Sequence, residues 1–183
     1  RFGVESTIVD VTGDVVVILR PGAITREMIE EVAGAVQLDP GLLAQERAAE
    51  GAGAAGDAAP RAPGMKYTHY APRAPLTLLL AAPADLPAAV RRVLAEAAGK
   101  KVGLLLTDET AAALLGEVDA HVLVRLGARS DMHAIAARLY EALRAFDETS
   151  VSCIFGEALD ENGLGLAVMN RLKKAAGYRI RSF

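Results

Sequence analysis

The sequence predicts an α/β protein with two sheet-forming parts joined by a linker. Three observations support this prediction. The first 37 residues contain two β-branched apolar runs and then one helical pattern. A stretch rich in Ala and Gly follows, and after Pro75 short apolar runs alternate with amphipathic ones. We therefore expect the end of one α/β sheet domain at 1–37, a linker at 38–74 and a small parallel-sheet domain at 75–183.

The first segment is expected to form a hairpin and a helix. The runs 4–11 and 15–19 are separated by "TGD", which is typical of a turn between antiparallel strands. A Pro-Gly turn follows, and the next helix is capped by Thr25 and ended by Gly34. The expected apolar stripe of this helix consists of Ile24, Met28, Ile29 and Val32. Two strands and one short helix are too few for a domain, so the segment is expected to end a larger one.

The linker changes character along its length. Residues 48–60 contain seven Ala and three Gly, which is typical of a flexible tether. The next segment, "RAPGMKYTHYAP" at 61–72, carries two tyrosines, a histidine and a lysine between prolines. Residues 61–73 hold three basic and no acidic side chains, for a local charge of +3. A passive tether would need none of these side chains. We call residues 61–72 the clasp.

The part after the linker alternates strictly between strand and helix patterns. The expected strands are 76–80, 101–106, 120–126 and 150–156. The expected helices are 84–98, 108–116, 130–147 and 164–176. Short, fully apolar strands between amphipathic helices indicate a parallel sheet covered on both faces. We therefore predict a small Rossmann-like domain.

Composition excludes several classes of protein. Of 183 residues, 52% are hydrophobic and 23% charged, which argues against disorder. The net charge of −3, and a charge near zero over 76–183, argue against strong direct nucleic-acid binding. Cys153 is the only cysteine, so no internal disulfide or cysteine-based zinc cluster is expected; we predict that it is a small buried apolar residue.

Two further features concern location and completeness. No apolar run approaches the roughly 18–20 residues that span a bilayer, and no signal peptide is visible, so a soluble cytoplasmic protein is expected. The chain also begins without methionine, in a strand-like sequence. We therefore expect a fragment whose N-terminal part is missing.

The last helix has two glycines that invite a nucleotide hypothesis. Gly163 and Gly165 in "ENGLGLA" lie at its start, but the rest of the G-x-G-x-x-G spacing is missing. Tight packing of helix against strand is the better interpretation. Three cations lie near the end of this helix, where the negative end of the helix dipole is expected to stabilise them: Arg171, Lys173 and Lys174.

The hairpin carries the best candidate for ligand chemistry. "EST" places a carboxylate and two hydroxyls side by side, and Arg20 ends the neighbouring strand before the Pro-Gly turn. If the strands pair, the hydroxyls and the guanidinium can face one ligand, and arginine suits phosphate through its planar fork. A surface salt bridge from Arg20 to Glu5 or Asp14 explains the spacing equally well.

Three segments together match a known family. "GVESTIVDV…VILRPGAIT", "APGMKYTHYAP" and "LYEALRAFDE…GLGLAVMNRLKKAA" resemble the long form of the L-threonylcarbamoyladenylate synthases, which are YrdC-like enzymes with an added C-terminal domain. The resemblance covers the whole chain apart from the Ala-rich part of the linker. It implies that 1–37 is the C-terminal end of a YrdC-like catalytic domain.

The resemblance also implies an activity. L-Threonine, bicarbonate or CO2, and ATP would become threonylcarbamoyl-AMP and pyrophosphate, with Mg²⁺ accompanying ATP. The product would supply tRNA threonylcarbamoyl-transfer machinery that modifies an adenosine beside the anticodon. The fragment alone is expected to be inactive, and no catalytic residue or protein-bound metal is assigned to it.

Site residues carry over only where the motifs match. Ser6 and Thr7 would contact L-threonine, and Arg20 the ATP phosphates. In the clasp, the resemblance places four side chains near ATP, with the first as the main candidate: Tyr70, Lys66, Tyr67 and His69. A flexible tether with this stiff, basic and aromatic clasp could close over the site and exclude water from an unstable intermediate.

Two other functions remain open on the sequence. Residues 75–183 could be a non-catalytic or regulatory module that recognises tRNA, a partner protein or a small ligand. They could also be a Rossmann-type nucleotide-dependent enzyme, which the missing glycine fingerprint disfavours.

Overall fold

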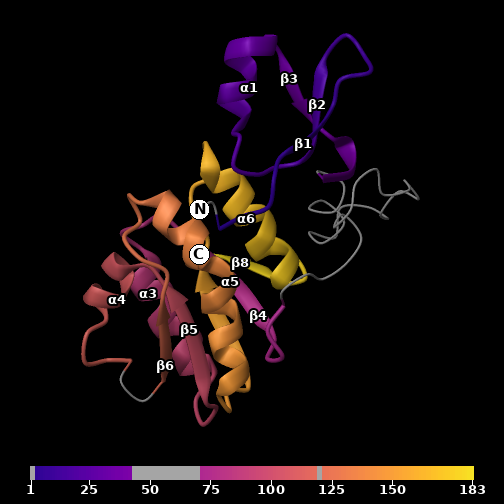
Figure 1. Ribbon diagram of the computed structural model, residues 1–183. Coiled ribbons are helices and arrows are strands. Elements are labelled where there is room, and N and C mark those ends of the chain that lie inside the picture. Colours follow the sequence, from indigo (N-terminus) through magenta and orange to yellow (C-terminus); the bar gives the residue numbers. More distant parts are fainter. Residues whose placement is uncertain (1–2, 43–70, 119–120) are drawn as a thin grey trace.

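A computed structural model describes residues 3–42, 71–118 and 121–183 of the chain. Its strands form two sheets, one of three strands and one of five. The three-stranded sheet and its helix lie at one end of the molecule, and the five-stranded sheet lies at the other (Figure 1). Helix α6 (Leu164–Ala175) lies between them.

The three-stranded sheet contains the expected hairpin and one additional strand. Its elements are β1 (Ile8–Asp10), β2 (Val16–Arg20), α1 (Arg26–Ala33) and β3 (Val36–Leu38). β1 pairs antiparallel with β2, and β2 pairs parallel with β3. β1 is shorter than the predicted run 4–11, and Val4 at the start of that run packs instead in the buried cluster under α5 (Met132–Ala145) and α6. β3 was not predicted, since three residues give too short a pattern.

The helix of this sheet has the expected ends but not the expected burial. Thr25 Oγ1 accepts a hydrogen bond from the Met28 amide at 3.4 Å, and Gly34 follows the last turn with a φ of 78°. However, α1 buries none of its residues, and Met28 and Val32 are 50% and 90% exposed. The apolar stripe predicted for α1 is therefore on the surface of the described structure.

The five-stranded sheet is parallel throughout, as predicted. Its strands are β4 (Leu76–Leu80), β5 (Val102–Leu106), β6 (Val122–Arg125), β7 (Cys153–Glu157) and β8 (Ile180–Ser182). They lie in the order β6-β5-β7-β4-β8. β8 is an edge strand that the sequence did not reveal, because only one of its three residues is apolar.

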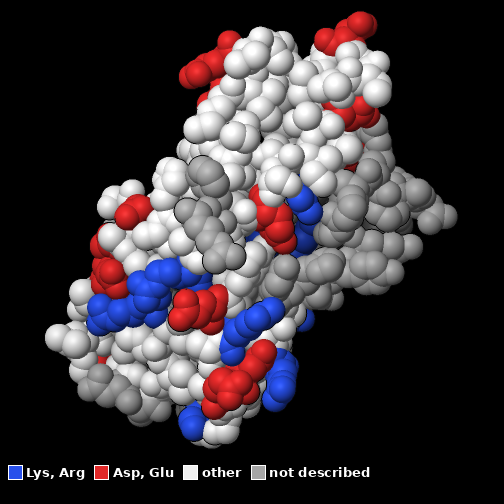
Figure 2. Space-filling model, in the orientation of Figure 1, with Lys and Arg blue, Asp and Glu red and all other residues white. Residues whose placement is uncertain are grey.

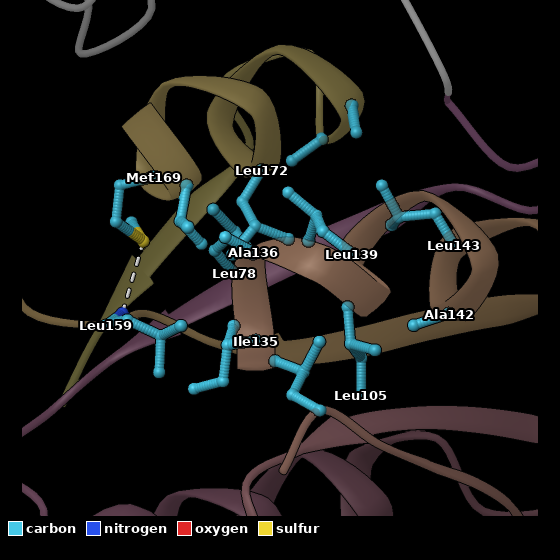
Figure 3. Packing of buried hydrophobic residues seen from close by; sticks show 14 of the residues in the cluster. Leu78, Leu105, Ile135, Ala136, Leu139, Ala142, Leu143, Leu159, Met169 and Leu172 are labelled. Carbon is cyan, nitrogen blue, oxygen red and sulfur yellow. Dashed lines mark hydrogen bonds between the residues drawn. The ribbon is translucent and has the colours of Figure 1, made fainter. Parts of the chain in front are cut away.

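Helices cover both faces of this sheet. The remaining helices are α3 (Leu86–Glu96), α4 (Asp108–Ala113), α5 (Met132–Ala145) and the short 3-10 helix η1 (Phe146–Glu148). One buried cluster lies under α5 and α6, and a second lies under α3 and α4. Figure 3 shows the first, in which Leu78 and Leu105 from the sheet meet Leu139 and Leu172 from the helices. Cys153, expected to be buried, is only half-buried at the edge of the second cluster.

None of the helices in the described ranges combines the length and the apolar composition needed to cross a bilayer.

Candidate functional site

The hairpin brings two of the predicted site residues into contact. Arg20 Nε donates a hydrogen bond to the Ser6 carbonyl at 3.1 Å, and its Nη2 lies 3.1 Å from Ser6 Oγ. Antiparallel pairing explains this contact, because Ile8 lies opposite Arg20 and Ser6 is two residues before Ile8. Ser6 is exposed and Arg20 is half-buried. The hydroxyl and the guanidinium therefore lie side by side at the end of the hairpin.

The third predicted residue of the hairpin, Thr7, holds the backbone. Its hydroxyl donates to the Ile24 carbonyl at 2.6 Å and accepts from the Ile24 amide at 3.1 Å. Thr7 thereby joins β1 to the start of α1. Ser6 is left as the exposed hydroxyl of the pair.

The Pro-Gly turn after Arg20 packs directly on the residues beside Ser6. A Cβ placed on Gly22 would lie 2.3 Å from the Thr7 amide nitrogen and 2.4 Å from the Glu5 carbonyl oxygen. Real Cβ atoms do not approach backbone so closely, so only glycine fits at this position. This close contact fixes the distance between the two ends of the hairpin.

Glu5, Tyr140 and Arg171 connect the hairpin to helices α5 and α6, which cover the five-stranded sheet; we call these three residues the junction. The Tyr140 hydroxyl donates to Glu5 Oε2 at 2.5 Å, and Arg171 Nε donates to the same oxygen at 2.8 Å. Arg171 Nη1 also donates to the Pro21 carbonyl. Arg171 on α6 therefore contacts the residue before Ser6 and the residue after Arg20. Neither ion pair considered for Arg20 from the sequence, with Glu5 or with Asp14, occurs among the described contacts.

The junction strongly favours an ionised Glu5. Burial pushes the pKa of Glu5 up, but the Tyr140 hydrogen bond and the Arg171 charge outweigh burial and lower it to about 2. Burial and the hydrogen bond to Glu5 raise the pKa of Tyr140, so its proton stays on the phenol. The junction is thus a fixed carboxylate between two donors.

A second cation from α6 lies close to the junction. Lys174 is 8% exposed. Burial lowers its pKa to about 8, with Arg171 and Arg20 acting in the same direction and Glu5 opposing them. Lys174 therefore lies close enough to be repelled by Arg171 and Arg20 and attracted by Glu5. Cations gathered near the hairpin suit an anionic ligand.

The other predicted site residues cannot be placed. Lys66, Tyr67, His69 and Tyr70 of the clasp lie outside the described residues. No group of three His, Cys, Asp or Glu side chains that could hold a metal ion occurs within 3–42, 71–118 and 121–183.

Comparison with known proteins decides the family. The sequence profile described as "Threonylcarbamoyl-AMP synthase, C-terminal domain" matches residues 24–177, which is most of the chain. The chain belongs to this family.

Two curated threonylcarbamoyl-AMP synthases are similar along almost the whole chain. The Bacillus subtilis (strain 168) protein is 42% identical over 179 residues, covering 98% of this chain and 47% of the relative. The Pyrococcus abyssi (strain GE5 / Orsay) protein is 41% identical over 186 residues, covering 98% of this chain and 48% of the relative. The chain therefore spans about half the length of the curated threonylcarbamoyl-AMP synthases that it matches.

Solved structures agree with the fold. The crystal structure of P. abyssi Sua5 complexed with L-threonine has a TM-score of 0.80 and 39% identity, and covers all of this chain and 48% of its own. A P. abyssi Sua5 variant with an adjacent His and Tyr both changed to Ala has a TM-score of 0.79 and 38% identity, with the same coverage.

Sequence reasoning missed the role of Arg171 in the junction. It assigned Arg171 to the helix dipole, but the side chain pairs with a carboxylate 166 positions away. A local signal was present: "MNRLKKA" places four polar residues within a helix that is otherwise apolar. Arg171, Lys173 and Lys174 are all buried, because α6 has a covered face on each side.

Proposed function

We propose that this chain is the C-terminal half of an enzyme that makes threonylcarbamoyl-AMP and pyrophosphate from L-threonine, bicarbonate or CO2, and ATP. The contact between Ser6 and Arg20, in a chain with synthase relatives, carries this proposal. The product feeds the tRNA threonylcarbamoyl-transfer machinery in the cytoplasm. Within the chain, 1–37 ends the catalytic domain, 38–74 is the linker and 75–183 is the C-terminal domain.

Each hairpin residue has a distinct task in this proposal. The exposed hydroxyl of Ser6 contacts L-threonine, and Thr7 beside it keeps β1 and α1 together. Arg20 donates to ATP phosphate oxygens, for which its fork geometry is suited. The existence of a P. abyssi Sua5 complex with L-threonine supports an amino-acid site in this family.

In the proposed reaction, the residues of this chain stabilise negative charge, and no proton transfer is assigned to them. Threonine's amine and bicarbonate form a carbamate with loss of water. A carbamate oxygen then attacks the α-phosphorus of ATP, and the bond to the pyrophosphate oxygen breaks. Negative charge develops on phosphate oxygens during this step, so fixed cations such as Arg20 stabilise the transition state. Lys174 and Arg171 add to the positive potential near the hairpin.

The clasp would close over the reacting groups. Tyr70 is the main candidate to reach the nucleotide, with Lys66, Tyr67 and His69 around it. The variant P. abyssi protein lost an adjacent His and Tyr, and this chain has one such dipeptide, His69-Tyr70. The described residues offer no carboxylate set for Mg²⁺, so we propose that Mg²⁺ enters on the ATP phosphates and assign no residue to it.

Substitution of Arg20 in the complete enzyme tests the proposal. Arg20→Ala should lower kcat/KM strongly. The lost transition-state stabilisation should be about 2–4 kcal/mol, as when other preorganised donors are removed. Arg20→Lys keeps the charge but loses the fork, so it should remain severely impaired. Pyrophosphate release with ATP, L-threonine and bicarbonate measures the effect.

A matched control separates this role from general damage to the fold. Arg26→Ala removes an arginine from the same part of the chain, where it pairs with Glu30 on the exposed surface of α1. It should retain nearly full activity. Wild-type kcat/KM for ATP in folded Arg20→Ala enzyme would show that Arg20 does not bind phosphate.

A further inference from the structure

A cavity of about 640 Å³ opens at the carboxyl ends of the parallel strands, and none of its lining residues belongs to the hairpin. Residues that follow β4, β6 and β7 in loops, and Glu109 in the first turn of α4 after β5, contribute to it. The lining residues that matter here are Leu80, Leu86, Glu109, Arg129, Ser130 and Asp160. Its volume is within the range of about 300–1,000 Å³ that is usual for small-molecule sites.

The topology of the sheet explains why a crevice forms at this place. The chain leaves β4 and β5 toward the face covered by α3 and α4, and leaves β6 and β7 toward the face covered by α5 and α6. In the order β6-β5-β7-β4, neighbouring strands therefore send their connections to opposite faces. Such switch points are where open α/β sheets bind their ligands.

A rigid guanidinium lines this cavity. Arg129 Nη2 lies 3.2 Å from Glu157 Oε1 and donates to the Thr110 hydroxyl at 2.8 Å. Glu157 is 1% exposed, and its other oxygen accepts from the Thr107 amide at 3.0 Å. The Glu157 carboxylate is buried, whereas the Arg129 side chain is 27% exposed and faces the cavity, so the ion pair holds the guanidinium where a ligand can reach it. Arg129 is held before any ligand arrives, which lowers the entropy lost on binding.

Two carboxylates at the rim of the cavity determine which charged ligands it can accept. Glu109 and Asp160 are exposed at its edge, whereas the charge of Arg129 is already balanced by Glu157. The hydrogen bond from the Arg129 amide lowers the pKa of Glu109, which keeps this carboxylate ionised. The rim is therefore net negative and repels phosphate. Carboxylates at such sites accept hydrogen bonds from ribose hydroxyls.

The remaining wall is apolar. Leu86 is buried, and Leu80 is half exposed although it is a large aliphatic side chain. A flat ring system would cover Leu80, while Ser130 and Arg129 supply donors for ring acceptors. We propose that this cavity binds an uncharged nucleoside, with its base on the leucine wall and its ribose hydroxyls on Glu109 and Asp160.

Calorimetric titration of the 183-residue chain tests the proposal. The ligands are adenosine, guanosine, cytidine and uridine, each compared with its 5′-monophosphate. At least one nucleoside should bind, and its monophosphate should bind at least about tenfold more weakly because of the negative rim. Binding of the monophosphate as tightly as the nucleoside would overturn the proposal, and so would an absence of heat for all four nucleosides.

Conservative variants locate the site. Asp160→Asn keeps an oxygen for the hydrogen bond that Asp160 accepts from the Asn162 amide, so the turn should persist while ribose binding weakens about tenfold or more. Asp14→Asn makes the same charge change far away, in the β1–β2 turn, and should leave affinity unchanged. Arg20→Ala should also leave it unchanged, which separates this cavity from the proposed ATP site. Unaltered affinity in Asp160→Asn, or lost affinity in Arg20→Ala, would refute the assignment.

Discussion

Glu5 is the residue through which the hairpin is fixed to α6. Its carboxylate accepts hydrogen bonds from Tyr140 and Arg171, and the next residue is Ser6. Arg171 is 6% exposed, and a charge that deeply placed needs a partner. A single carboxylate therefore satisfies a buried cation and positions the proposed threonine contact.

This arrangement makes part of the stability of the chain depend on pH. The pKa of Glu5 is about 2, below its ordinary 4.5, so the folded state favours the ionised form. The stabilisation is fully present above pH 4.5 and is lost as the pH falls toward 2. Glu5→Gln should lower the free energy of unfolding by about 1–2 kcal/mol at pH 7, because one charged hydrogen-bond acceptor is lost. That difference from wild type should shrink between pH 4.5 and 2, as measured by urea unfolding at each pH.

Comparison of two glutamates separates this effect from general acid denaturation. Glu30→Gln removes the acid of the exposed Arg26–Glu30 pair on α1. It should change stability by less than about 0.5 kcal/mol at any pH. A Glu5→Gln deficit that is constant with pH would contradict the low pKa of Glu5.

At the scale of single elements, β5 shows how closely the sheet and its helical cover fit. Gly103 is the second residue of β5 and has no positive φ, so its backbone alone would allow any residue. A Cβ there would lie 2.7 Å from Phe146 Cε1 and 3.1 Å from Ile154 Cγ1. Glycine is therefore present because the Phe146 ring occupies the space beside the strand.

Gly103→Ala should therefore destabilise the chain through overpacking. The Phe146 ring must move in a core where it is only 1% exposed, at a cost of about 1–3 kcal/mol. Gly13→Ala is the control, because nothing lies within 4 Å of the added methyl group. Thermal unfolding should show a clearly lower Tm for Gly103→Ala alone. Equal Tm values for both variants would show that the core relaxes around the methyl group.

The elements differ in how well the sequence predicts them, for physical reasons. β4 and β5 are buried on both faces, so their continuous apolar runs are unambiguous. β3 and β8 have three residues each and depend on pairing with β2 and β4, which the local sequence does not encode.

The contacts of the candidate site also differ in how well the sequence predicts them. The contact between Ser6 and Arg20 could be predicted, because hairpin pairing follows from a local turn. The contact between Arg171 and Glu5 could not, because it depends on how α6 packs against a segment far away in sequence. The cavity at Arg129 was also missed, since its residues come together only through the strand order.

At the scale of the whole molecule, α6 is shared by the two sheets. One side of α6 packs on the five-stranded sheet through Val168 and Leu172, as Figure 3 shows for Leu172. The other side meets the hairpin through Arg171, and Glu27 of α1 accepts from the Gly163 amide at 3.3 Å. In Figure 2, basic and acidic side chains lie next to each other across the visible lower part of the molecule, so charge is largely paired on that face.

The distribution of the core predicts how the two parts behave when separated. Both large buried clusters draw their members from residue 74 onward, with Val4 as the one upstream contribution among the described residues. Removing the hairpin would also uncover the outer side of α6, so Arg171 would regain water and would not remain as a buried unpaired charge. The five-stranded sheet should therefore lose little stability.

We accordingly expect the segment 75–183 to fold alone and to make no threonylcarbamoyl-AMP. It should show a cooperative thermal transition and retain slow amide exchange in β4, β5 and β7, whose centres are buried on both faces. It should release no pyrophosphate from ATP with L-threonine and bicarbonate, because Ser6, Arg20 and the clasp are absent, while the complete enzyme serves as the positive control. An unfolded segment would mean that the hairpin is part of the same cooperative unit. Turnover by the folded segment would contradict the proposed placement of the chemistry at the hairpin and in the preceding half of the enzyme.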